Sequence, residues 1–174
     1  MIEFDGVKLL PIEYEDVVLL NKWKNDEGIF KYLGGGYRPT SLSQQKNWMD
    51  KLTENTMENQ RYMIVDEEEK KVGQIGLYQI SNIHKTCSLG IYIGEKGKQG
   101  KGIASKAYKA LENYAKSYLN IRKIHLEVVG ENERAIKMYE RLGFYVCGKY
   151  QKERYIDGEY KDLIIMDKFI GENN

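Results

Sequence analysis

A glycine- and lysine-rich segment, lying between a strand-like pattern and a helical one, constrains the fold more than any other feature of the sequence. Apolar residues alternate with glycine and tyrosine from Leu89 to Gly94, which is the period of a β-strand. The pattern stops over residues 95–102, and from Ile103 to Tyr118 apolar side chains recur every three or four residues, which predicts an amphipathic helix. A loop in this position presents free backbone N–H groups and the positive end of a helix dipole, so it favours a phosphate ligand.

Two common phosphate-binding motifs do not fit this loop. The P-loop needs its framing glycines five residues apart, whereas Gly94 and Gly100 are six apart. Gly102 stands where the P-loop has the Ser or Thr that binds magnesium. The dinucleotide fingerprint fails because no second strand with a ribose-binding acid follows at the required distance. The loop is therefore expected to belong to another class of phosphate site.

The remaining segments predict a mixed α/β protein with one domain over residues 1–174. Strand-like segments first form hairpin pairs and then alternate with helical segments, an order that implies a mixed sheet with helices on its faces. Residues 154–161 are expected to form a hairpin around a tight turn at Asp157-Gly158. Expected strands cover residues 7–12, 61–66, 72–80, 86–93, 123–129, 144–150 and 163–169, and expected helices cover residues 15–25, 41–54, 103–118 and 133–142.

Composition excludes several classes of protein. The 27 basic and 26 acidic side chains nearly cancel, so a nucleic-acid-binding surface is not expected. Cys87 and Cys147 are isolated, which leaves neither a disulfide framework nor a zinc pattern. The N-terminus lacks the basic start and apolar core of a signal peptide, and no apolar run approaches membrane-spanning length. We therefore expect a cytoplasmic protein with no metal and with neither nucleic acid nor membrane as a partner.

Two motifs together resemble a known family. The loop Gln99-Gly100-Lys101-Gly102-Ile103-Ala104 is similar to the Gln/Arg-x-x-Gly-x-Gly/Ala signature of the GNAT acetyltransferase superfamily, in which it holds the pyrophosphate of acetyl-CoA. Further along, Asn132, Ala135, Tyr139 and the pair Gly143-Phe144 follow a strand in the order of the second GNAT signature. The resemblance points to the branch of ribosomal-protein N-terminal and spermidine acetyltransferases. It implies a mixed sheet of about seven strands with about four helices on its faces, and a splayed strand pair that holds acetyl-CoA.

The resemblance also implies a set of residues that bind acetyl-CoA. The strand backbone at Ile91, Tyr92 and Ile93 is expected to pair with the pantetheine amides. Asn132 is expected to add a side-chain contact, although capping of the following helix also explains this residue. The remaining contacts are expected at Gln99, Gly100, Lys101, Gly102, Ile103 and Ala104, with Lys106 as a further cation for the 3′-phosphate.

Acetyl transfer to an amine needs a proton donor for the leaving thiolate and a base for the ammonium group. Tyr139 stands at the family's position for the acid, and packing of its helix is the alternative explanation. Glu127 is the candidate base, because it lies in an otherwise apolar strand where burial would raise its pKa. Many relatives carry a carboxylate as the base in an Ala-Glu-Leu-Gly pattern, and Ser88 stands at that position here. This difference favours Glu127 or a chain of water molecules as the route for the proton. His84 and His125 are further options.

The acceptor amine is the least constrained part of the prediction. The flexible loop Gly34-Gly35-Gly36-Tyr37-Arg38 either covers the substrate or is a plain surface connection. We take Tyr37, Arg38 and Ser88 as candidate substrate-binding residues, with Arg38 meeting an anionic group. A protein N-terminus or an amino-sugar or other small-molecule amine is expected, and the alternatives are a polyamine such as spermidine or an acyl-CoA sensor without turnover. A homodimer through the Asp157-Gly158 hairpin is a further expected partner.

Overall fold

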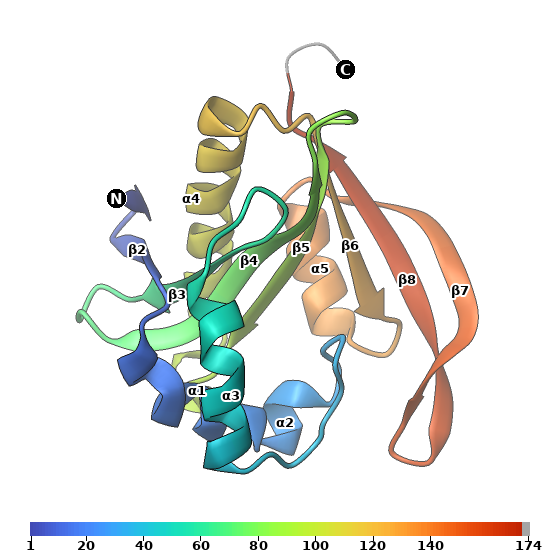
Figure 1. The fold of residues 1–174 in the computed structure, drawn as a ribbon. Helices are drawn as coiled ribbons and strands as arrows, with labels where there is room; N and C mark the ends of the chain where they lie inside the picture. Colours follow the sequence, from blue (N-terminus) through green and yellow to red (C-terminus); the bar gives the residue numbers. More distant parts are fainter. Residues whose placement is uncertain (172–174) are drawn as a thin grey trace.

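A computed structural model describes residues 1–171 as a single eight-stranded sheet with helices on both faces (Figure 1). The strand order is β1-β2-β3-β4-β5-β6-β8-β7, and every neighbouring pair is antiparallel except β5 and β6, which run parallel. The strands are β1 (Ile2–Phe4), β2 (Val7–Pro11), β3 (Gln60–Val65), β4 (Lys71–Ser81), β5 (Thr86–Ile93), β6 (Lys123–Val129), β7 (Tyr145–Ile156) and β8 (Glu159–Phe169).

The helices form two layers, and each layer has its own apolar core. On one face lie α1 (Val17–Lys24), α2 (Glu27–Phe30) and α3 (Leu42–Thr53), and on the other lie α4 (Ile103–Tyr118) and α5 (Glu133–Arg141). Two 3₁₀ turns, η1 (Tyr14–Asp16) and η2 (Lys96–Lys98), precede α1 and α4. No helix within residues 1–171 is long and apolar enough to span a membrane.

Most expected elements are confirmed, and three details are corrected. The sheet has eight strands rather than about seven, because Ile2–Phe4 adds an edge strand. The short helix α2 was not expected; it has only four residues, too few to show a helical period. The expected strand at residues 144–150 and the first arm of the hairpin expected at residues 154–161 form one continuous strand, β7, which ends at Ile156. Its almost fully exposed edge and a register shift between Tyr150 and Arg154 hide the alternation on which strand prediction depends.

The first helical layer is fastened to the end of β5. Trp23 of α1 is fully buried, and its indole Nε1 donates a hydrogen bond to Glu95 Oε1 at 2.9 Å. Gly94 lies directly under this ring: a Cβ atom there would come within 2.2 Å of it. Gly94 therefore permits α1 to approach the sheet closely, and this contact fixes one wall of the site described below.

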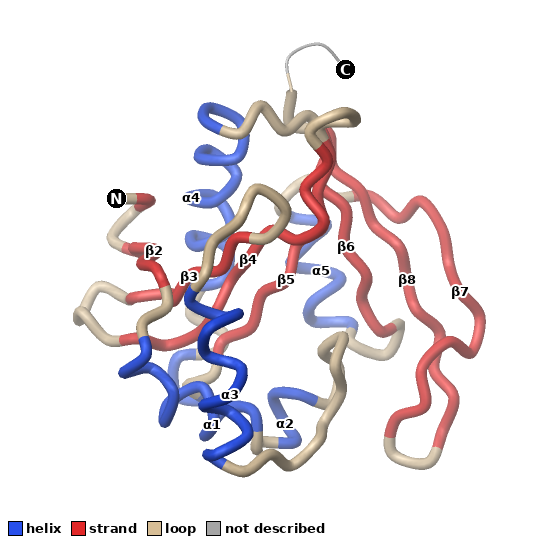
Figure 2. The backbone as a smooth tube through the Cα atoms, in the orientation of Figure 1, coloured by secondary structure: helices blue, strands red, loops and turns tan. Residues whose placement is uncertain are grey.

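The parallel strands β5 and β6 separate partway along their length. They pair only at Thr86 with Lys123, Cys87 with Ile124 and Ser88 with His125, after which β5 continues against β4 and β6 against β8. Figure 2 shows the two strands close together at one end and far apart at the other. The splayed pair expected from the sequence is thus present, and within residues 1–171 the inner edge of β5 beyond Ser88 has no sheet partner.

Candidate active site

One cavity occupies the gap between the separated strands. It has a volume of about 400 Å³ and is lined by the end of β5, the loop before α4, the first turn of α4, the end of β6 and one side of α5. Ile91, Tyr92 and Ile93 contribute the unpaired edge of β5. Backbone N–H and C=O groups on such an edge are free to bond an extended, amide-bearing ligand. We call this cavity the donor slot.

The glycine-rich loop closes one end of the donor slot. Gly102 is the N-cap of α4 with φ +77°, and Gly100 has φ +73°, so both positions favour glycine. Gln99 Nε2 donates to the carbonyl of Ile93 at 3.0 Å, which ties the loop to the end of β5. Ile103 and Ala104 line the slot at the start of the helix, where backbone N–H groups have no partner within the helix. This end of the slot is suited to phosphate groups.

The cations beside this loop differ from those expected. Lys101 is exposed and does not line the slot. Lys106 is bound by Asp5 at 3.1 Å and Glu67 at 2.9 Å. Two arginines of α5 that were not predicted from the sequence, Arg134 and Arg141, do line the slot.

Arg134 lies closest to the loop. A Cβ atom placed on Gly100 would be 2.7 Å from Arg134 Nη2. Arg134 lies in the first turn of α5, two residues after the N-cap, and this position in the sequence could have identified it as a residue near the loop. The N-cap residue itself, Asn132, accepts a hydrogen bond from the backbone N–H of Ala135 at 3.4 Å and also lines the slot. Capping is therefore observed, and a ligand contact by Asn132 stays a prediction.

A second, larger cavity lies on the α1–α3 face of the sheet. Its volume is about 960 Å³, and its walls come from α1, α3, β3, β4, β5, β6 and the segment after α2. Six residues line both cavities, so the two spaces adjoin each other; they are Tyr32, Leu33, Ile91, Tyr92, Glu127 and Tyr139. We call the larger space the acceptor cavity.

Both candidate catalytic residues lie where the two cavities meet. Tyr139 is buried, and its ring packs edge-on against Phe144 with centroids 5.7 Å apart. Burial raises the pKa of the Tyr139 phenol to about 12, so the proton stays on oxygen throughout the neutral range. A protonated phenol at this junction is placed to act as a proton donor.

Glu127 differs from the sequence-based expectation. It was expected to be buried in its strand, but it is exposed, because β6 has left β5 at this point and the side chain faces open space. Two residues earlier on the same strand, His125 faces the acceptor cavity. His125 Nδ1 lies 2.8 Å from Asp167 Oδ1 on β8, whereas His84 sits on an exposed turn and lines neither cavity.

The pair formed by His125 and Asp167 is partly buried and lies beside Lys123. Burial on its own raises the pKa of Asp167, but hydrogen bonds from His125 and Lys123, together with their charges, outweigh burial and leave the pKa below its usual value. Asp167 Oδ2 is 3.3 Å from Lys123 Nζ. The carboxylate therefore fixes the orientation of the imidazole at the floor of the acceptor cavity.

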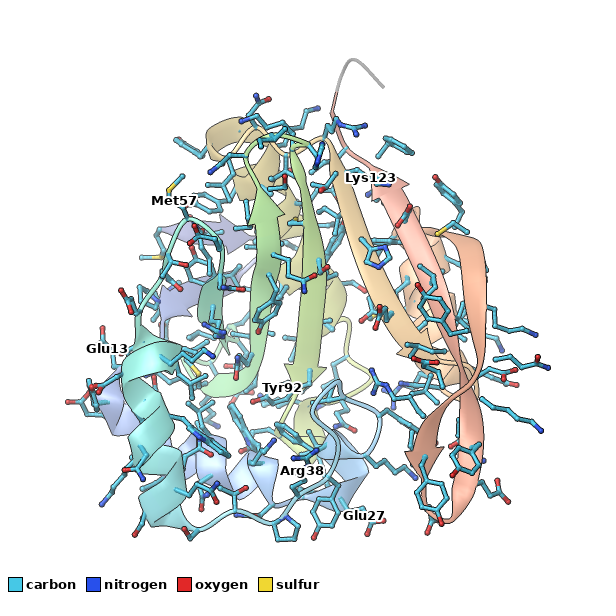
Figure 3. All side chains as sticks on the ribbon, turned by 45° about the vertical axis from the view of Figure 1, so that its right-hand side comes forward. Glu13, Glu27, Arg38, Met57, Tyr92 and Lys123 are labelled. Carbon is cyan, nitrogen blue, oxygen red and sulfur yellow. The ribbon has the colours of Figure 1, made fainter. Side chains whose placement is uncertain are left out.

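The candidate substrate residues separate into two groups. Ser88 lines the acceptor cavity, whereas Tyr37 and Arg38 are exposed and line neither cavity. In the view of Figure 3, Arg38 lies below Tyr92. The segment before them does cover the site: Leu33, Gly34 and Gly35 line the acceptor cavity, and Arg154 Nη1 donates to the Leu33 carbonyl at 3.2 Å.

The acceptor cavity is rich in cations. Lys24, Lys51, Arg61 and Arg154 all line it, while Glu127 is its only carboxylate among the described residues. Gln45 lies in the same wall; it is 4% exposed, and its Oε1 atom has no hydrogen-bond partner within the described part of the chain. Within residues 1–171, no cluster of three or more His, Cys, Asp or Glu side chains could hold a metal ion.

The fold and the two adjoining cavities define an acyl-CoA-dependent transferase. The free strand edge of the slot fits the pantetheine arm of CoA, and the glycine-rich loop fits its pyrophosphate. The second cavity provides room for an acceptor. Residues 7–145 match the acetyltransferase (GNAT) domain, and the chain belongs to this family. It is accordingly an acetyl-CoA-dependent N-acetyltransferase.

Several relatives are named for their substrates. The chain is 32% identical over 162 residues to the spermidine N(1)-acetyltransferase of Escherichia coli, covering 92% of this chain and 84% of that protein. It is 29% identical over 92 residues to the putative ribosomal N-acetyltransferase YdaF of Bacillus subtilis, covering 53% and 50%.

Solved structures give the same family. A spermidine N-acetyltransferase from Vibrio cholerae, in complex with CoA and spermine, superposes with a TM-score of 0.85 at 27% identity, covering 94% of this chain and 95% of that one. Another structure of that enzyme, with a TM-score of 0.79 and 26% identity over 95% of this chain and 94% of that one, is described as dodecameric. These similarities support the expected branch of the family.

Proposed function

We propose that this acetyltransferase works by direct attack of a primary amine, bound in the acceptor cavity, with Tyr139 as general acid. Acetyl-CoA supplies the thioester whose acetyl group is transferred. The observation that carries the proposal is the junction of the two cavities at Tyr139 and Glu127. A group held there would reach a sulfur atom in the donor slot and an amine in the acceptor cavity at once.

In this mechanism Tyr139 gives its proton to the leaving sulfur. Its raised pKa keeps the phenol protonated until the sulfur develops negative charge. The ammonium proton leaves on the opposite side, where Glu127 is the candidate base, directly or through water. Exposure of Glu127 to solvent makes a water-linked path feasible. His125, oriented by Asp167, stays the second option for accepting this proton.

The donor contacts named from the sequence are part of the same proposal. Bound CoA would place its pantetheine along Ile91, Tyr92 and Ile93 and its phosphates at residues 99–104. Arg134 and Arg141 replace Lys101 and Lys106 as the cations that we expect to meet the phosphates, because the arginines line the slot and the lysines do not. Asn132 would bind the ligand through whichever amide atoms its cap leaves free.

For the acceptor we propose a primary amine on a protein N-terminus, an amino sugar or another small molecule. The second candidate is a polyamine, and the names of the E. coli and V. cholerae relatives favour it. The presence of a phenol and a carboxylate at the junction disfavours the third possibility, an acyl-CoA sensor without turnover. The cytoplasmic location predicted from the sequence stays a prediction.

A thiol-release assay with acetyl-CoA tests the proposal. The acceptors would be spermidine, N-terminal peptides, amino-sugar nucleotides and aminoglycosides, with the acetylated product confirmed by mass spectrometry. We expect release of CoA that depends on one class of amine. Tight acetyl-CoA binding without amine-dependent release would favour the sensor, and absence of acetyl-CoA binding would refute the proposed donor slot.

We also propose a homodimer. Tyr155 and Tyr160, next to the Asp157-Gly158 turn, are each 66% exposed, and their rings pack against one another at an interplanar angle of 55° with centroids 5.0 Å apart. Exposed aromatic side chains grouped on a hairpin are typical of an interface between copies. Light scattering during gel filtration tests this, and a Tyr155→Ser, Tyr160→Ser variant should shift the mass toward that of a single chain.

A further inference from the structure

We propose that the acceptor amine carries a carboxylate or phosphate group, which Lys24, Lys51 and Arg61 bind inside the acceptor cavity. This inference rests on the proposed function, and it specifies the class of amine. It separates the two substrate candidates by charge, since a polyamine has several positive charges and no negative one.

The cavity has a surplus of positive charge. Lys24, Lys51, Arg61 and Arg154 line it, against the single carboxylate of Glu127. None of the four cations forms an ion pair with a carboxylate of the described residues. A polycation brought into this cavity would be repelled by four charges and attracted by one.

Lysines near the donor slot have a different environment. Lys98 lies 2.7 Å from both Asp66 and Glu68, and Lys106 is bound by Asp5 and Glu67. This protein therefore neutralises partly buried ammonium groups with its own carboxylates in that region. The part of the chain that the structure describes offers the cations of the acceptor cavity no such ion pair, which leaves them available to a ligand.

Aromatic and backbone contacts hold two of these cations, Lys24 and Arg61, in position. Lys24 Nζ lies 4.7 Å from the ring centroid of Phe30 and 5.9 Å from that of Trp48. The guanidinium carbon of Arg61 is 5.1 Å from the ring centroid of Tyr78, and Arg61 Nη1 donates to the carbonyl of Lys51 at 3.3 Å. Side chains fixed in this way lose little further conformational entropy when they bind an anion.

The environment of Lys24 also favours an anionic ligand. Burial, followed by the nearby charge of Arg38, lowers the pKa of Lys24. A carboxylate or phosphate beside the ammonium would counter both effects. The unpartnered Oε1 of Gln45 in the same cavity needs a donor, which a hydroxyl or N–H group of the ligand would supply. The cavity thus matches an amine that carries an anionic group together with hydroxyl or amide groups.

Matched acceptors that differ only in charge test the inference. One set is γ-aminobutyrate, aminobutanol and diaminobutane, which share a chain length and a primary amine and differ in the far group. The second pair is glucosamine and its phosphate ester at the ring-distal hydroxyl. We expect kcat/KM to be at least about tenfold higher for the anionic member of each set, and lowest for the diamine. A diamine or spermidine that is preferred over its anionic counterpart would overturn the inference.

Variants connect the preference to these residues. In a Lys24→Gln, Arg61→Gln double variant we expect the anionic-to-neutral ratio of kcat/KM to fall about tenfold. Lys46→Gln is the matched control, because Lys46 is an exposed cation on α3 that lines neither cavity. Thermal melting and acetyl-CoA binding confirm that each variant is folded. An unchanged ratio in the folded double variant would contradict the assignment.

Binding measurements keep this inference separate from the proposed function. Calorimetric titration of the CoA-bound enzyme with glucosamine and with its phosphate ester measures recognition without turnover. Tighter binding of the ester, lost in the double variant, supports the anion site even if none of these amines is acetylated. Amine-dependent CoA release with no preference for the ester in either assay supports the acetyltransferase mechanism and refutes the anion site.

Discussion

The donor slot and the acceptor cavity are neighbours that are built in different ways. The donor slot uses backbone groups: a free strand edge at residues 91–93, two glycines with positive φ and the start of α4. The acceptor cavity uses side chains from distant parts of the chain, including Lys24 on α1, Lys51 on α3 and Arg154 on β7. Only the residues at their junction, such as Tyr139, serve both.

This difference shows where each kind of specificity resides. In the proposed mechanism, backbone groups in the slot would bind the amides and phosphates that every CoA thioester carries, which requires particular local geometry but few particular side chains. In the same proposal, side chains in the acceptor cavity would determine which amine is bound, and such side chains can change without disturbing the fold. A fold-level relationship to spermidine acetyltransferases is therefore compatible with a different acceptor.

The largest effect is expected at the junction. Tyr139→Phe removes the proton donor and keeps the ring that packs against Phe144, so turnover should fall by about a hundredfold while acetyl-CoA affinity is retained. Steady-state kinetics and direct binding of acetyl-CoA measure the two quantities. Tyr118→Phe, at an 80% exposed position, is the matched control. Unchanged turnover would remove Tyr139 from the mechanism.

A smaller effect is expected from the loop of the donor slot. Gly102→Ala introduces a Cβ at φ +77°, which costs about 1 kcal/mol and should weaken acetyl-CoA binding roughly fivefold. The KM for the amine should change much less, because Gly102 does not line the acceptor cavity. Gly97→Ala is the control, since that glycine has no positive φ and open space around its Cβ. Equal effects of the two variants would show that the loop conformation does not matter for binding.

An effect of similar size is expected from one of the cations beside the loop but not from another. Arg134→Gln should raise the Kd of acetyl-CoA about threefold to fivefold, because the guanidinium lies against Gly100 in the slot. Lys106→Gln should leave Kd unchanged, because its ammonium is already bound by Asp5 and Glu67. Titration of acetyl-CoA at two salt concentrations measures both. A larger rise in Kd for Lys106→Gln than for Arg134→Gln would contradict this assignment and favour Lys106, the cation predicted from the sequence.

The smallest effect concerns the floor of the acceptor cavity. The pKa of Asp167 is lowered in the folded state, so its ionised form stabilises the fold at neutral pH, and this contribution is lost as pH falls below about 4. Asp167→Asn should lower the free energy of unfolding by about 1 kcal/mol at pH 7. The free energy of unfolding of this variant should also fall less steeply than that of the wild type as the pH is lowered below about 4. Asp157→Asn is the control, because Asn suits the same exposed turn. Identical acid profiles for wild type and Asp167→Asn would contradict the pairing with His125.

The same contrast explains which parts of the site could be predicted from the sequence. Gly102 and Asn132 were identifiable because caps and glycines occupy fixed positions relative to a helix start. Lys51 and Arg154 were not, because only the folded sheet brings α3 and β7 to one cavity. The burial expected for Glu127 was wrong for a related reason: an apolar strand pattern does not reveal that β6 leaves β5 at that residue.

The position of the first helical layer on the sheet could not be predicted from the sequence either. Nothing in the pattern around Trp23 indicates that its ring packs on Gly94, yet this contact sets the distance between α1 and the sheet. Arg38 was chosen for its charge and its loop, but it is the residues just before it, Leu33 to Gly35, that line the cavity. Tertiary contacts, such as the hydrogen bond from Arg154 to the Leu33 carbonyl, determine where loop residues lie. The periodicity of the sequence does not predict such contacts.

A crystal structure of the protein with CoA would test the central claim most directly. The account predicts that pantetheine lies between β5 and β6 along residues 91–93, with its sulfur within hydrogen-bond distance of the Tyr139 hydroxyl. The acceptor cavity should open onto that sulfur from the α1–α3 face. CoA bound elsewhere, or in the slot with its sulfur directed away from Tyr139, would contradict the account.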